Sequence, residues 1–114
     1  MIYPSTMTVQ TVQLITKIIK AVCDEFDIQV NDLEKNQKIN RNASKEAVLI
    51  SYARSVAMLL LSAHFKQQTV ANLLNCTNHS TVCVAIRRAK LLAEVNPMIK
   101  EKLKNINKQL YEKH

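Results

Sequence analysis

The stretch with the clearest chemical potential is a run of five short polar residues, Thr77-Asn-His-Ser-Thr81. All five side chains can form hydrogen bonds, and the run directly precedes a segment with apolar residues at helical spacing. Asn pairs well with adenine edges, and Ser and Thr reach bases, phosphates and the thymine methyl group. The backbone amides at the start of a helix also attract phosphate oxygens. The run therefore predicts a helix whose first turn contacts duplex DNA in the major groove.

Cys76, His79 and Cys83 offer a different chemistry, because their spacing brings metal-ligating residue types into the same region. Zinc usually requires four protein ligands, and no fourth ligand is apparent here. A cysteine–histidine nucleophile pair would lack both an orienting group and an oxyanion site. The chain contains no glycine, so a glycine-rich phosphate loop is excluded. We therefore predict no catalytic residue, no metal, no cofactor and no small-molecule substrate, and hence not an enzyme.

The charge distribution points to a polyanionic partner. The net charge is +7 and the pI is about 9.5, which favours nucleic acid or an acidic surface. Residues 1–34 hold five carboxylates and only two lysines, so this part is expected to face away from the polyanion.

The odd number of cysteines suggests reduced thiols, and the longest apolar run, residues 56–61, is too short to span a bilayer. With no visible signal peptide, we expect a cytoplasmic, nucleoid-associated protein without a membrane partner.

The elements that position the polar run are predicted to be helices. The sequence is 47% hydrophobic and lacks the glycines of tight hairpins, which indicates one compact all-α domain over residues 1–114 with five to six helices. Apolar periodicity predicts helices over residues 8–26, 44–64, 67–74, 78–95 and 97–111, with a short turn at 31–34. Ser44, Asn78 and Asn96-Pro97 fit helix starts. The apolar stretch 56–61 predicts a central buried helix, whereas the lysines of the last helix are typical of a solvated face.

Residues 67–74 and 78–95 are separated by a three-residue break, which is the arrangement of a helix-turn-helix over about residues 66–95. Arg87 and Arg88, further along the second helix, would then reach the flanking DNA backbone. The same pattern also fits an ordinary helical hairpin with a polar cap. Pattern alone leaves these two interpretations open.

Three segments together resemble a known family. They are Tyr52-Ala-Arg-Ser-Val-Ala-Met-Leu-Leu-Leu61, Gln68-Thr-Val-Ala-Asn-Leu-Leu74 and His79-Ser-Thr-Val82. They resemble the C-terminal DNA-binding domain (domain IV) of the bacterial replication initiator DnaA. That family has an Ala-Arg-x-x-Ala-Met helix, followed by a recognition helix that opens with Asp-His-Ser/Thr-Thr-Val. The resemblance spans roughly residues 14–95 and implies a Trp-repressor-like helix-turn-helix fold that binds double-stranded DNA.

The resemblance also implies which residues contact DNA. The start of the recognition helix would face bases and phosphates, Arg54 and the start of the preceding helix would lie near the backbone, and a basic loop would reach the minor groove. With the residues indicated by the pattern itself, the predicted contacts are Thr77, Asn78, His79, Ser80, Thr81, Arg54, Lys66, Gln68, Arg87, Arg88, Lys38, Arg41 and Lys45.

The chain departs from the family at the turn. Where the family usually has Gly-Gly-Arg-Asp, this sequence has Asn75-Cys-Thr-Asn78. The missing Arg is a principal base reader, and a bidentate base contact is worth about 1–3 kcal/mol, so the preferred DNA sequence should differ from the usual initiator box. The expected function is sequence-specific DNA binding in replication initiation or its regulation. The alternative is a protein-interaction module that kept the fold and lost specific DNA reading, and a protein partner or a homodimer stays open.

Overall fold

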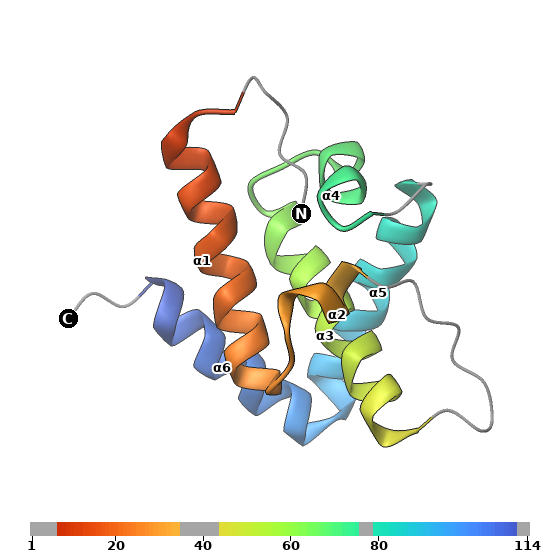
Figure 1. Ribbon diagram of the computed structural model, residues 1–114. Coiled ribbons are helices and arrows are strands. Elements are labelled where there is room, and N and C mark those ends of the chain that lie inside the picture. The colour runs from red at the N-terminus through yellow and green to blue at the C-terminus, as the bar shows by residue number, and fades with distance from the viewer. Residues whose placement is uncertain (1–6, 35–43, 76–78, 112–114) are drawn as a thin grey trace.

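The computed structural model describes residues 7–34, 44–75 and 79–111, and over these residues the chain forms helices and no strand (Figure 1). The prediction of an all-α fold with five to six helices is therefore confirmed. The helices in chain order are α1 (Val9–Phe26), α2 (Val30–Glu34), α3 (Lys45–Ser62), α4 (Gln67–Leu73), α5 (His79–Val95) and α6 (Pro97–Tyr111).

The helix starts follow from side chains that accept the first unpaired amides. The hydroxyl of Ser44 accepts a hydrogen bond of 3.1 Å from the amide three residues later, at the start of α3. Before α6, Asn96 Oδ1 accepts from the amide of Met98 at 3.0 Å, and Pro97 occupies the first helical position. Both starts were predicted. The predicted cap at Asn78 lies outside the described residues.

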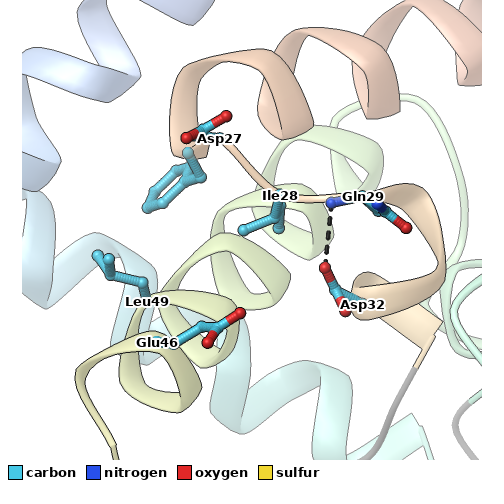
Figure 2. Close-up of a pocket in the computed structure, with 7 residues that line it drawn as sticks. Asp27, Ile28, Gln29, Asp32, Glu46 and Leu49 are labelled. Carbon is cyan, nitrogen blue, oxygen red and sulfur yellow. Dashed lines mark hydrogen bonds between the residues drawn. The ribbon is translucent and has the colours of Figure 1, made fainter.

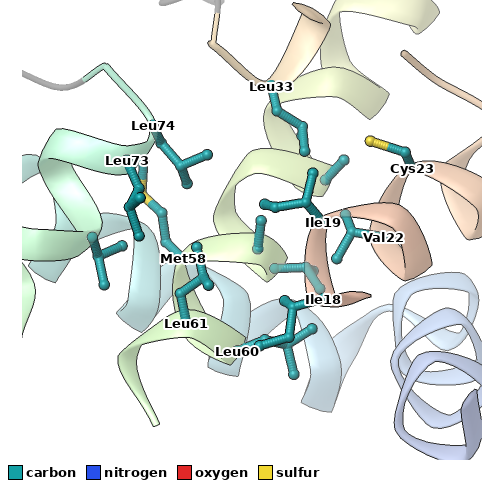
Figure 3. Packing of buried hydrophobic residues seen from close by; sticks show 14 of the residues in the cluster. Ile18, Ile19, Val22, Cys23, Leu33, Met58, Leu60, Leu61, Leu73 and Leu74 are labelled. Atoms are coloured by element: carbon teal, nitrogen blue, oxygen red, sulfur yellow. The ribbon is translucent and has the colours of Figure 1, made fainter. Parts of the chain in front are cut away.

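Helix α3 is the centre of the hydrophobic core. Six consecutive residues, 53–58, are buried, and α3 contacts α1, α2, α4 and α5. Ala53 and Ala57 are fully buried, and their small side chains let neighbouring helices approach closely. Met58 and Leu61 of α3 pack between Leu73 and Leu74 on one side and α1 on the other (Figure 3). The prediction of a central buried helix is confirmed.

Among the described residues, two helices are followed by a residue with positive φ, although the chain has no glycine. Asp27, after α1, has a φ of 54°, and Asn75, after α4, has a φ of 57°. Asp and Asn are the non-glycine residues that most readily adopt this left-handed conformation, because their short polar side chains can bond locally. At these two turns, Asp27 and Asn75 therefore take the place of glycine.

Helix α6 closes the core by packing on α1 and α5. Ile99 and Ile106 are fully buried. Lys102 Nζ donates to the carbonyl oxygen of Glu25 at 2.8 Å and lies 5.3 Å from the ring centre of Phe26. The prediction that the lysines of this helix form a solvated face is thus wrong for Lys102, because its stem and ammonium group cover the carboxyl end of α1. None of the helices described is long and apolar enough to cross a membrane.

Candidate nucleic-acid interface

Helices α4 and α5 form a helix pair with its own apolar contact. Val70, Ala71 and Leu73 of α4 and Val82 of α5 are almost completely buried. At the edge of this contact, Cys83 Sγ donates to the side-chain oxygen of Gln67 at 2.9 Å. The thiol thus fixes α5 to the first turn of α4, which orients the second helix of the pair.

Asn75 makes the turn between these helices. It is exposed, and it stands where the family pattern has its first glycine. Its positive φ explains why Asn can replace glycine there: the backbone requires the left-handed conformation, and Asn adopts it more easily than other side chains. The rest of the predicted break, with Thr77 and Asn78, lies outside the described residues.

The first turn of α5 presents polar side chains to solvent. The helix begins at His79, and Ser80 and Thr81 are exposed, as a base-contacting turn requires. The side chain of His79 lies outside the described part of the structure. Val84 was not among the predicted contacts, and it is 63% exposed one turn later on the same side as Ser80 and Thr81. The signal was available, because residues three and four apart share a helix face.

Arg87 and Arg88 are adjacent in sequence but differ in their surroundings. Arg87 is exposed. Arg88 is half-buried, its Nη1 donates to Ser51 Oγ at 3.1 Å, and its guanidinium lies 5.3 Å from the centre of the Tyr52 ring. The cation–π contact and the hydrogen bond hold Arg88 between α3 and α5.

Arg54 is more deeply placed than the resemblance implies. It is only 8% exposed, and its Nη1 donates to the carbonyl oxygen of Leu33. The bond joins α3 to α2, so Arg54 has a structural role. Arg54 also lines a hollow of about 170 Å³ between α3 and α5, together with residues that include Thr81 and Arg88. Two guanidinium groups thus lie directly behind the exposed first turns of α5.

The remaining predicted contacts lie at helix starts or outside the described residues. Lys66 is the exposed N-cap of α4, and Gln68, in the first turn, is exposed and donates to Asn72 Oδ1 at 3.1 Å. Lys45 is exposed at the first position of α3. Lys38 and Arg41 lie outside the described residues.

An acidic hollow marks a different part of the molecule. It has a volume of about 760 Å³ between the end of α1, α2 and the start of α3, and carries the carboxylates of Asp27, Asp32 and Glu46 (Figure 2). Thr81 and Met58 line the separate α3–α5 hollow instead, and Met58 follows Glu46 by twelve residues, about 18 Å along the helix, so the two hollows lie along different parts of α3. The carboxylates repel phosphate, so the acidic hollow does not belong to a DNA contact.

The cysteines described in the structure are structural residues. Burial raises the pKa of Cys23 to about 11, with further contributions from Asp24 and Asp32, so the thiol stays protonated. Cys83 donates to Gln67. Among the described residues, no group of three His, Cys, Asp or Glu side chains is placed to hold a metal. Cys76 and the His79 side chain, two members of the candidate zinc set, lie outside that range.

A helix pair joined by a sharp turn, with an exposed polar first turn on the second helix and guanidinium groups behind it, defines a helix-turn-helix DNA-binding domain. The family model for the bacterial dnaA protein helix-turn-helix matches residues 15–89, about two thirds of the chain. The chain therefore belongs to this family, whose domain binds double-stranded DNA and is not catalytic. The match runs from α1 into α5, and α6 lies beyond it. A search of curated proteins found no significant match.

Proposed function

We propose that this chain binds double-stranded DNA sequence-specifically, with the first turns of α5 in the major groove. The observation that carries the proposal is the exposure of Ser80 and Thr81 in front of Arg88 and Arg54, the two guanidinium groups of the α3–α5 hollow. Short polar side chains can approach base edges closely, and cations behind them neutralise the phosphates that border the groove.

The base contacts fall to the start of α5. Asn78, His79 and Ser80 would face bases, with Thr77 and Thr81 at the border between bases and phosphates. Asn78 both donates and accepts, and a bidentate pair with adenine is its most specific contact.

The phosphate contacts fall to the surrounding cations and helix starts. Arg87 and Arg88 would bind one side of the groove, and Lys66 and Gln68 at the start of α4 the other. Arg54 would support this surface from the α3–α5 hollow. Lys38, Arg41 and Lys45 would follow the adjacent minor groove.

The biological process that we propose is replication initiation or its regulation, because the family takes its name from the initiator. The sequence has no glycine and hence no glycine-rich phosphate loop, so an ATP-driven step is not encoded in these 114 residues. We propose that residues 1–114 act as one DNA-site-recognising domain on the nucleoid.

The test is duplex selection from a random pool, followed by mobility-shift titrations of the selected duplex over a range of salt. His79→Ala should relax the preference at one or two base pairs. Arg87→Gln should weaken binding to all duplexes alike and reduce the slope of log K against log salt by about 0.9, the value of one neutralised phosphate. Lys104→Gln, on α6, is the matched control and should change neither quantity. If both His79→Ala and Arg87→Gln bind as wild type does, the proposal is wrong.

Arg54 needs a different variant, because its guanidinium also bonds Leu33. Arg54→Ala would remove the contact between α3 and α2 and confuse unfolding with lost binding. Arg54→Lys keeps the charge, so a uniform loss of affinity with an unchanged thermal transition would assign a DNA contact to the guanidinium.

The second candidate function is a protein-interaction module that retains the fold. The observation that favours it is the turn sequence Asn75-Cys-Thr-Asn78, which lacks the Arg that reads bases in the family. The same titrations separate the two functions. Equal and weak binding to every duplex would favour the interaction module.

A further inference from the structure

Val84 is the apolar residue on the exposed side of the first turns of α5. Its side chain is 63% exposed. It follows Ser80 by four residues and Thr81 by three, so the three side chains share one face of the helix. Val84 also lines the α3–α5 hollow beside Arg54 and Arg88. An apolar side chain thus stands in the middle of a polar and cationic surface.

Neither packing nor helix stability explains a valine at this position. The apolar contact with α4 is made by Val82, which is fully buried, while Val84 points to solvent. At an exposed helix position the β-branched side chain of Val is less favourable than Ala, by a few tenths of a kcal/mol or more. The position therefore suits a contact that forms only when a partner is bound.

We propose that Val84 contacts the C5-methyl group of one thymine in the major groove and thereby selects thymine at that position. This inference rests on the proposed function, because it requires α5 to enter the groove. Thymine is the base that presents a methyl group there, and the other pyrimidine, cytosine, does not. The isopropyl group of Val84 is a matching apolar surface, and the neighbouring guanidinium group of Arg88 would hold the DNA backbone beside it.

The expected effect is small and measurable. Removing one methyl group from such a contact lowers affinity about fourfold, which corresponds to about 0.8 kcal/mol. Deoxyuridine lacks only the C5-methyl group of thymidine, so a single substitution in the duplex removes this contact and leaves every hydrogen bond in place.

The experiment is a scan in which each thymine of the selected duplex is replaced in turn by deoxyuridine, with wild type, Val84→Ala and Val95→Ala. Val95 is the matched control: it is a valine of the same helix, 65% exposed, and lies eleven residues, about 16 Å, further along. Wild type and Val95→Ala should lose about fourfold at one thymine. Val84→Ala should bind the thymine duplex as weakly as wild type binds that deoxyuridine duplex, and should lose nothing further at this thymine.

Two results would overturn the inference. In the first, wild type binds every deoxyuridine-substituted duplex as tightly as the thymine duplex. In the second, Val84→Ala loses affinity at the same thymine methyl group as wild type does. In either case, selective duplex binding that depends on His79 would leave the proposed function intact. A wild-type chain that selects no duplex at all would overturn both.

Discussion

The turn at Asn75 gives a prediction whose size follows from backbone geometry. Asn75 has a φ of 57° and is exposed, so its side chain contributes little burial and its conformation dominates the effect of a substitution. A side chain with a Cβ but no local hydrogen bonding costs about 1–2 kcal/mol in the left-handed region, and Asn bears less of this cost. We expect Asn75→Ala to lower the free energy of unfolding by about 1 kcal/mol, and Asn75→Val by about 2 kcal/mol.

Thermal unfolding converts these energies into measurable shifts. The unfolding entropy of a chain of 114 residues is about 240 cal/mol/K, so a loss of 1 kcal/mol lowers Tm by about 4 °C. Asn75→Gly should differ from wild type by less than about 0.5 kcal/mol, because the freedom of glycine at positive φ is offset by its larger entropy in the unfolded chain.

Asn107→Ala is the matched control for this series. Asn107 is exposed within α6, where Ala is the better helix former, so the same substitution should stabilise the protein by up to about 0.6 kcal/mol. Because the backbone conformations differ, Asn→Ala should lower the free energy of unfolding at position 75 and raise it at position 107. Two results would refute the explanation that Asn75 replaces glycine through its left-handed backbone conformation. One is an Asn75→Ala protein that unfolds at the same temperature as wild type, and the other is an Asn75→Gly protein that is the least stable of the three Asn75 variants.

Three further predictions concern stability, pH and preorganisation. Between pH 9 and 11 the wild type should lose more stability than Cys23→Ala in urea titrations, because the folded thiol keeps its proton to about pH 11 while the unfolded thiol ionises from about 9; parallel pH profiles would contradict the raised pKa. Lys102→Met should lower the free energy of unfolding by about 1 kcal/mol and Lys104→Met by almost nothing, and equal effects would refute the contact between α6 and α1. Ser51→Ala should weaken binding to all duplexes two- to fivefold with little change in Tm, because it releases Arg88; unchanged affinity would show that the hydrogen bond does not matter.

Much of the fold could be predicted because its signals are local. Helix starts depend on cap residues such as Ser44 and Asn96, and the inward faces depend on periodicity within one helix, so α3 was identified as central from residues 56–61 alone. The helix-turn-helix was also local, since its two helices and turn are contiguous in sequence. The first turn of α5 was predicted for the same reason.

The contacts that could not be predicted from the sequence join residues that lie far apart along the chain. The carbonyl of Leu33 accepts from Arg54, twenty-one residues away, and Lys102 reaches Glu25 across seventy-seven residues. Periodicity states which face of a helix points inward, but it does not state which element meets that face. The exposure of Val84 is different, because its signal was local: Val84 shares a helix face with the polar residues Ser80 and Thr81.

The positions of the cations are therefore a better guide to DNA affinity than the net charge of +7. Lys102 and Arg54 stabilise contacts between helices, so their charges are not simply additional phosphate contacts. Arg87 and Arg88 have equal charge and adjacent positions, yet a guanidinium that is already held in one place loses less conformational entropy when it meets a phosphate. Arg88 is held by α3, and Arg87 is exposed. Affinity for duplex DNA should for this reason depend more strongly on Arg88 than on Arg87.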